Sequence, residues 1–154
     1  MDNVYELLDK LNIDYKMIEH KAVFNIEEIN QLKLDIEGIG CKNLFLTDHH
    51  NNYYLYVIKD DKKADLKILQ EILDVKRLSF ASTSCLYEKL KLTPGSVSPI
   101  GIINDNGSVI LLLDKELNNS KILVHPNINT RTLSMEYNDL LKIIRYYKNK
   151  YIEI

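Results

Sequence analysis

The sequence predicts an α+β fold in a single domain that spans residues 1–154. The length of 154 residues is that of one ordinary domain, and no repeat or linker divides the chain. Segments with helical periodicity and segments with β-strand composition follow one another in a mixed order, with hairpins and helical crossovers together. That order favours an α+β domain around a mixed sheet over a doubly wound parallel sheet.

Composition and charge exclude several classes of protein. Apolar residues make up 45% and charged residues 27% of the chain. This apolar content is too high, and the net charge too small, for an intrinsically disordered protein. The net charge of -2 gives no overall basic field, although a local basic patch stays open. The longest apolar run, residues 109–113, is far too short to span a membrane, and the polar start of the chain predicts no secretory signal. We expect a soluble protein of the cytoplasm.

The first half of the chain predicts three helices and a hairpin. Apolar residues at helical spacing indicate helices over residues 2–11, 26–32 and 65–73. Residues 15–19 are expected to be extended. Two β-rich runs, residues 43–47 and 53–59, flank a polar turn at residues 48–52, which predicts a hairpin.

The second half predicts short strands between two helices. Residues 77–80 are a strand candidate, and Ser82 or Thr83 is expected to cap a helix whose apolar residues extend to Leu92. The turn signal Asn104-Asp105-Asn106-Gly107 predicts a hairpin between residues 100–103 and residues 109–113. The remaining expected elements are strands over residues 122–124 and 130–135 and a helix over residues 138–147.

Histidine and cysteine patterns give no nucleophilic or metal site. The chain has no nucleophile elbow, phosphate-binding loop, dinucleotide fingerprint or HExxH motif. His49 and His50 are adjacent in the predicted turn, so we expect them to be solvated and unable to chelate one ion together. Cys41 and Cys85 are expected to be small core residues, and two cysteines form neither a disulfide framework nor a metal cluster.

A proline- and glycine-containing loop is the first candidate for function. Gly95 to Pro99 have little side-chain bulk and directly precede an apolar run. Such a loop exposes backbone N–H groups, which bind a carbonyl oxygen or a developing oxyanion. A plain turn is the alternative explanation of the same residues.

Two further segments are candidates. Lys42-Asn43 begins a buried-looking strand, where a lysine can contact a phosphate at the mouth of a cleft, or simply end an exposed strand. His125-Pro126-Asn127-Ile128-Asn129-Thr130 forms a restricted polar corner between two predicted strands. His125 can hydrogen-bond a substrate or transfer protons near neutral pH, or it can be a structural residue of the corner.

Five segments match one family in their order and spacing. They are Lys42-Asn43-Leu44-Phe45-Leu46, Leu78-Ser79-Phe80-Ala81-Ser82, Leu92-Thr93-Pro94-Gly95-Ser96-Val97-Ser98-Pro99, Gly101-Ile102-Ile103-Asn104-Asp105 and His125-Pro126-Asn127-Ile128-Asn129-Thr130. Together they resemble the YbaK/prolyl-tRNA-editing family, the free-standing relatives of the editing insertion in bacterial prolyl-tRNA synthetases. The long segment that begins at His125 is most similar to the stand-alone alanyl-tRNA(Pro) deacylases, the PrdX/ProX-type proteins.

The resemblance implies a fold and a reaction. The fold would be a mixed, partly barrel-like β-sheet surrounded by helices. The reaction would be metal-independent hydrolysis, without a cofactor, of the ester that joins a wrong amino acid to tRNA(Pro). A synthetase pocket that holds proline cannot exclude alanine by binding alone, since a methylene is worth only about 1–3 kcal/mol, and a second sieve is therefore needed.

The resemblance also assigns roles to residues. Lys42, Gly95 and His125 would be catalytic, with Lys42 holding the phosphate of the terminal nucleotides. The loop of the family's GxxxP motif would bind the aminoacyl group through its N–H groups, and Asn43 would line the pocket. The implied substrate-binding residues are Asn43, Ser96, Val97, Ser98 and Pro99.

The implied partner is the acceptor end of tRNA(Pro), and transient contact with prolyl-tRNA synthetase or an elongation factor stays open. No membrane partner is expected. Lysines and an arginine between residues 62 and 77 either form a local basic patch for RNA or a solvated helix face. Two other functions also remain open: deacylation of cysteinyl-tRNA(Pro), and non-catalytic binding of tRNA by the same fold.

Overall fold

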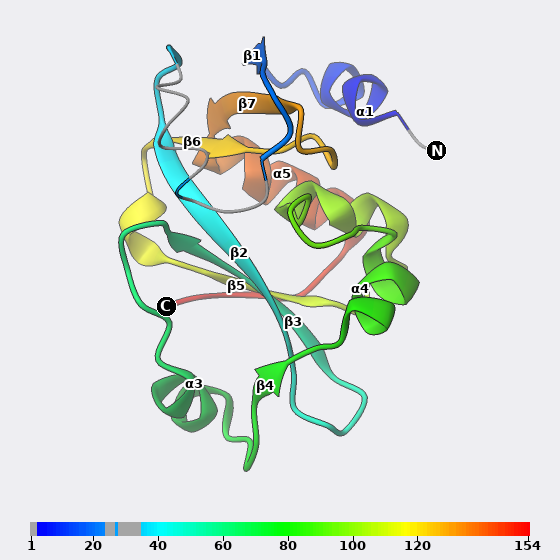
Figure 1. The fold of residues 1–154 in the computed structure, drawn as a ribbon, viewed down its shortest axis with the longest axis vertical. Helices are drawn as coiled ribbons and strands as arrows, with labels where there is room; N and C mark the ends of the chain where they lie inside the picture. Colours follow the sequence, from blue (N-terminus) through cyan, green and yellow to red (C-terminus); the bar gives the residue numbers. More distant parts are fainter. Residues whose placement is uncertain (1–2, 24–26, 28–34) are drawn as a thin grey trace.

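The computed structural model describes residues 3–23, 27 and 35–154 (Figure 1). Its strands are β1 (Tyr15–Glu19), β2 (Ile39–Thr47), β3 (Tyr53–Lys59), β4 (Ser79–Phe80), β5 (Ile110–Leu113), β6 (Lys121–Val124), β7 (Arg131–Glu136) and β8 (Tyr151–Glu153). Its helices are α1 (Val4–Lys10), α3 (Leu66–Leu73), α4 (Thr83–Leu90) and α5 (Tyr137–Tyr147), with short 3-10 helices η1 (Pro99–Asn104) and η2 (Lys115–Leu117). The expected helix over residues 26–32 lies, apart from Glu27, outside the described residues.

The described strands form one mixed sheet, so the predicted α+β class is confirmed. They lie in the order β1-β7-β6-β2-β3-β5-β8, and β4 pairs with β2 beside this path. β2 and β3 form the predicted antiparallel hairpin, whereas β5 lies parallel to both β3 and β8. β2 joins the two halves of the sheet, because its start pairs with β6 and its remainder with β3. Among the described strands, the pairing does not close into a ring.

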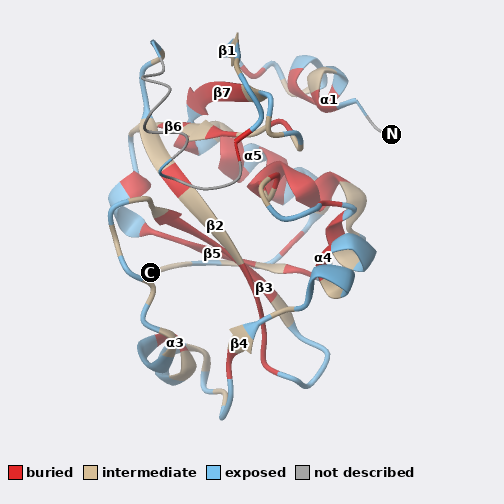
Figure 2. Ribbon diagram, viewed as in Figure 1, coloured by how far each residue is buried: buried red, intermediate tan, exposed pale blue. Residues whose placement is uncertain are grey.

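The two faces of β2 contribute to two separate apolar clusters. Buried residues concentrate in the central strands and on α5 (Figure 2). Cys41 and Phe45 belong to the larger cluster, which lies against α1, α4, η1 and α5. Leu44 and Leu46 belong to the smaller cluster under α3. This alternation follows from the period of two in a strand, and it decides on which face each polar residue of β2 lies.

Side-chain caps fix the helix starts that the sequence indicates. The carboxylate of Asp65 accepts hydrogen bonds from the N–H groups of Lys67 and Ile68 at 3.1 and 3.2 Å, at the start of α3. The Ser82 hydroxyl accepts from the Cys85 N–H at 3.1 Å, which confirms Ser82 as the cap of α4. α4 ends before Leu92, because Lys91 adopts a left-handed conformation with φ 57°.

The predicted hairpin between residues 100–103 and 109–113 is wrong. Residues 100–103 lie in η1, whose first residue, Pro99, has its φ set for a helix and lacks the N–H that strand pairing needs. The Ser98 hydroxyl accepts a hydrogen bond from the Ile100 N–H at 3.1 Å and caps this turn. Without residues 100–103 as a partner, β5 pairs with β3 and β8.

The structure also contains a strand that the sequence does not indicate. β8 follows α5 after a left-handed turn at Lys148, whose φ is 61°, and it runs parallel to β5. None of the helices in the described chain is long and apolar enough to cross a membrane.

A buried carboxylate joins the end of β5 to the end of β3. Asp114 is 2% exposed, and its oxygens accept hydrogen bonds from the N–H groups of Lys59 at 3.1 Å and Glu116 at 3.0 Å. The Lys62 ammonium donates to the same carboxylate at 2.8 Å and also pairs with Glu116. Asp114 therefore satisfies donors from three places in the chain at one buried point.

Candidate active site

The loop before η1 begins with a tight turn. The Ser96 N–H donates to the Thr93 carbonyl at 3.0 Å, and Gly95 has a φ of 90°. A proline followed by a residue with positive φ is typical of a type II turn, in which glycine is strongly favoured at the second of these positions. Pro94 and Gly95 thus fix the direction in which the loop leaves α4.

The rest of the loop keeps its backbone donors unused. In the described part of the chain, the N–H groups of Gly95, Val97 and Ser98 form no hydrogen bond. The Val97 carbonyl is held by the Asn43 carboxamide of β2, whose nitrogen donates to it at 3.3 Å. A loop fixed by its carbonyl and open at its amides is suited to stabilising a developing oxyanion.

Ser96, Ser98 and Pro99 contribute mainly to the shape of this loop. Ser98 and Pro99 are buried, and the Ser98 hydroxyl is used as the cap of η1. Ser96 is 9% exposed. Their predicted contact with substrate would therefore be through the backbone rather than through the side chains.

The segment between β6 and β7 packs beside this loop. The Asn127 carboxamide nitrogen donates to the carbonyl of Ile100, the second residue of η1, at 3.5 Å. Asn129 donates to the Val23 carbonyl at 2.9 Å and so connects the same segment to the chain after β1. Asn43, the loop and the segment from His125 to Asn129 are thus brought together from three distant parts of the sequence.

His125 is held in one tautomer at this junction. Its Nδ1 lies 2.8 Å from the Arg131 carbonyl oxygen. Because a carbonyl only accepts, Nδ1 carries the proton, and Nε2 is left with a lone pair when the ring is neutral. Within the described chain Nε2 has no hydrogen-bond partner.

The surroundings favour the neutral form of His125. Burial lowers its pKa from the ordinary value of 6.5, the bond to the Arg131 carbonyl partly offsets this, and the charge of His20 lowers it further. The His20 ring lies 6.2 Å from the His125 ring and is itself held by the Lys21 carbonyl and the Thr132 hydroxyl. A neutral imidazole with a free Nε2 can accept a proton from water at neutral pH.

A pH-dependent stability follows from this lowered pKa. Above pH 6.5 neither the folded nor the unfolded chain protonates His125, so the contribution of the neutral ring is fully present. As the pH falls below 6.5 through the folded-state pKa, the unfolded chain takes up the proton first, and stability is lost. We expect a smaller decrease in Tm between pH 7 and pH 5 for His125→Gln than for the wild type. Equal decreases in a thermal melt series would contradict this assignment.

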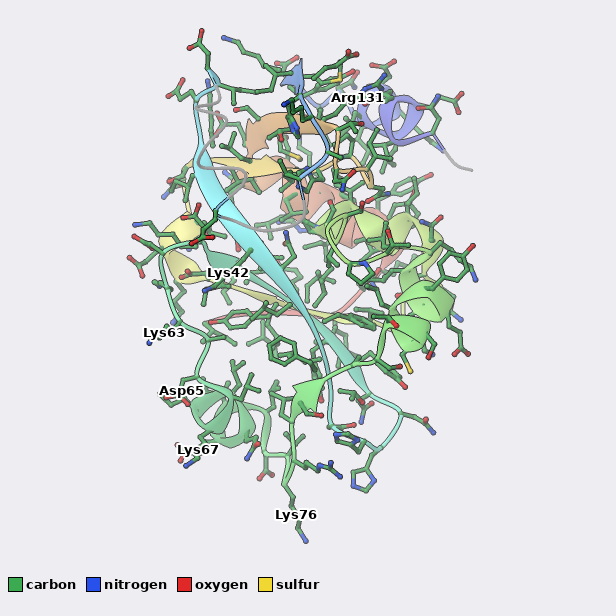
Figure 3. All side chains as sticks on the ribbon, viewed as in Figure 1. Lys42, Lys63, Asp65, Lys67, Lys76 and Arg131 are labelled. Atoms are coloured by element: carbon green, nitrogen blue, oxygen red, sulfur yellow. The ribbon has the colours of Figure 1, made fainter. Side chains whose placement is uncertain are left out.

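Lys42 lies apart from the residues described so far. By the alternation of β2 it shares a face with Gly40 and Leu44, opposite to Asn43. Its charged neighbour there is Asp60, whose pKa is raised by burial and partly lowered by the charge of Lys42. Figure 3 shows Lys42 beside the middle of β2, while Lys63, Lys67 and Lys76 lie around the outer surface near α3. The structure therefore brings Asn43 to the loop, connects the segment of His125 to η1 through Asn127, and places Lys42 on the other side of the strand.

The cysteines and the remaining histidines lie outside this junction. Burial raises the pKa of Cys41 to about 12, so this thiol stays protonated. Cys85 is only half-buried, contrary to the expectation of a core residue, and its sulfur lies 3.7 Å from the Tyr53 hydroxyl. His49 and His50 are exposed, as predicted. No three His, Cys, Asp or Glu side chains among the described residues gather closely enough to hold a metal ion.

For two polar residues of the junction, the sequence did not indicate the contacts that the structure shows. Asn127 adopts a left-handed conformation with φ 65°, which asparagine tolerates better than most residues, and its position after Pro126 was the available signal. His20 follows a predicted strand without any motif, so its approach to His125 depends on the pairing of β1 with β7.

Comparisons with known proteins identify the family. Residues 20–143 match the model of the aminoacyl-tRNA editing domain. The prolyl-tRNA editing protein ProX of Acetoanaerobium sticklandii is 44% identical over 149 residues, which cover 94% of this chain and 90% of that protein. Prolyl-tRNA synthetase associated domain-containing protein 1 of Danio rerio is 34% identical over 143 residues, covering 90% of this chain and 78% of that protein.

Solved structures share the fold at low sequence identity. A crystal structure of a hypothetical protein superposes with a TM-score of 0.78 at 16% identity, and covers 99% of this chain and 98% of that one. A crystal structure of a proposed trans-editing enzyme for prolyl tRNA synthetase gives a TM-score of 0.75 at 17% identity, covering 97% and 92% of the two chains. From its sequence match and its fold, this chain belongs to the family of aminoacyl-tRNA editing domains.

Proposed function

We propose that this protein is a trans-editing deacylase that hydrolyses mischarged Ala-tRNA(Pro) to alanine and tRNA(Pro). The observation that supports it most is the loop Gly95–Ser98, whose unused N–H groups lie beside Asn43 and the segment of His125. The 44% identity to a prolyl-tRNA editing protein supports tRNA(Pro) as the substrate RNA.

The proposed reaction needs no covalent enzyme intermediate. A water molecule attacks the ester carbonyl carbon, and its proton passes to Nε2 of His125. The charge that develops on the carbonyl oxygen is stabilised by the loop N–H groups. The bond to the ribose oxygen then breaks, and the proton on Nε2 neutralises that leaving oxygen. The acyl ester is already activated, so positioning and oxyanion stabilisation suffice without a metal ion.

Lys42 is proposed to hold a phosphate of the terminal nucleotides. A ribose separates that phosphate from the ester, so the lysine need not share the face of β2 that carries Asn43. We expect Lys42→Ala to lower kcat/KM on Ala-tRNA(Pro) about 10- to 100-fold through loss of a charge-assisted contact. Lys115→Ala, a change of the same kind at an exposed lysine of η2, should have little effect. Equal rates for the Lys42 variant and the wild type would remove Lys42 from the site.

The decisive experiment compares Ala-tRNA(Pro), Cys-tRNA(Pro) and Pro-tRNA(Pro) as substrates of the purified protein in the presence of EDTA. Rapid loss of alanine alone is the expected result. Preferential loss of cysteine would assign the protein to the cysteinyl-tRNA(Pro) deacylases instead. Saturable binding of tRNA without hydrolysis of any ester would make it a binding module of the same fold.

A further inference from the structure

Two carboxamide oxygens at the candidate site are buried without a hydrogen-bond partner. They are Oδ1 of Asn43 and Oδ1 of Asn127. Both side chains contact the same short stretch of chain, since Asn43 donates to Val97 and Asn127 donates to Ile100. A buried acceptor without a donor is costly, so such groups in a folded protein call for an explanation.

The orientation of both carboxamides is fixed by their neighbours. The Val97 and Ile100 atoms that they meet are carbonyl oxygens, which only accept hydrogen bonds. Each asparagine must therefore present its nitrogen to the loop, and each oxygen must face elsewhere. An exchange of oxygen and nitrogen would place two acceptors against each other. The loop thus fixes two acceptors, and only a donor can satisfy them.

Other asparagines of the fold have structural explanations. Asn149 also carries a buried unpaired oxygen, but its nitrogen makes two short bonds, at 2.9 Å to Asp105 and 2.7 Å to the Val109 carbonyl, which secure the chain before β5. Asn104 at the end of η1 donates to the Leu90 carbonyl at 2.9 Å. Asn43 and Asn127 each make a single, longer hydrogen bond, so these bonds stabilise the fold less than those of Asn149.

The chemistry of the proposed substrate supplies the missing donor. An aminoacyl ester carries an α-ammonium group one carbon away from the carbonyl carbon that is attacked. The ammonium nitrogen is three bonds away from the carbonyl oxygen of the ester. If the loop N–H groups bind that oxygen, the ammonium group also lies close to the loop. We infer that the oxygens of Asn43 and Asn127 accept hydrogen bonds from the α-ammonium group of the aminoacyl ester. This inference rests on the proposed function and adds the substrate group that the site recognises.

Charge and burial are consistent with this assignment. The lowered pKa keeps His125 neutral at pH 7, so its imidazole adds no positive charge that would oppose the ammonium. Both oxygens are closed off from solvent, so the ammonium group reaches them only after the atoms around them have moved.

Three esters of tRNA(Pro) that differ only at the α-carbon test the inference. Alanyl, lactyl and propionyl esters carry an ammonium group, a hydroxyl group and a hydrogen atom at that position. The measured quantity is the rate with enzyme divided by the uncatalysed rate of the same ester, which removes differences in intrinsic reactivity. We expect the rate enhancement for the alanyl ester to exceed that for the propionyl ester at least about 100-fold, with the lactyl ester between them.

Variants of the two asparagines separate recognition from structure. Asn43→Ser and Asn127→Gly, the latter suited to the positive φ at that position, should each reduce the ratio of alanyl to propionyl enhancement about 10-fold. Asn104→Ser removes a similar bond to a carbonyl and should leave the ratio unchanged. Equal enhancement of the alanyl and propionyl esters by the wild type, or an unchanged ratio in both asparagine variants, overturns the inference. Failure to hydrolyse any ester instead overturns the proposed function.

Discussion

Replacing His125 by glutamine should reduce kcat on Ala-tRNA(Pro) by about 10²- to 10⁴-fold, the usual contribution of a general base. Glutamine is neutral and can still donate to the Arg131 carbonyl that fixes the ring, but it has no basic nitrogen with which to take the proton from water. KM should change little, because the side chain acts on the water rather than on binding of the tRNA. The measurement is single-turnover deacylation with saturating enzyme.

The pH dependence of the wild type supplies a second readout of the same group. Since the pKa of His125 is lowered from 6.5, the rate should be independent of pH around neutrality and fall only in more acidic solution. That acidic limb should disappear in His125→Gln. His50→Gln, at an exposed turn, is the matched control and should retain both the rate and the acidic limb. Retention of about one third or more of the activity in His125→Gln would show that this histidine only stabilises its corner.

Replacing Asp114 by alanine should lower the free energy of unfolding by about 3 kcal/mol, since two part-buried N–H groups and a partly exposed ammonium lose their buried acceptor. For a chain of this size such a loss corresponds to a decrease in Tm of about 6–12 °C. The ammonium of Lys62 is partly exposed and keeps Glu116 as a partner, so it adds little to the cost.

The control for this prediction is Asp61→Ala. Asp61 is an exposed carboxylate, and its 3.8 Å contact with Lys59 is a surface ion pair, for which changes within about 0.5 kcal/mol are usual. Chemical denaturation should show the two variants clearly apart with similar m-values. A Tm of the Asp114 variant within 1 °C of the wild type would mean that water takes over the role of the carboxylate.

Local features of the fold were predictable where one residue decides the structure. Ser82 indicated the start of α4 because its hydroxyl can replace a missing backbone acceptor, and the polar turn at residues 48–52 indicated the hairpin of β2 and β3. The strand predicted at residues 100–103 is wrong. The prediction relied on the apolar composition of these residues, whereas Pro99 starts a helical turn there. The parallel pairing of β3 with β5 joins residues more than fifty positions apart, so no local sequence pattern predicts it.

The candidate site was likewise predictable from the sequence only where local residues determine its structure. The sequence indicated the loop at Gly95 and its backbone donors, because a Pro-Gly pair has few conformations. It did not indicate that Asn127 reaches η1, since that contact depends on how β6 and β7 pack. The separation of Lys42 from Asn43 was within reach of the sequence, because adjacent residues of a strand face opposite sides. The family resemblance grouped the two residues by motif rather than by face.

The strand β8 has a further consequence for what the edge of β5 can pair with. It covers the outer edge of β5, whose residues Leu111, Leu112 and Leu113 are completely buried. An uncovered strand of that composition would offer unpaired N–H and C=O groups and an apolar surface to another copy of the chain. The three residues Tyr151–Glu153 thus prevent β5 from pairing with a strand of another molecule. We expect truncation after Lys150 to increase aggregation.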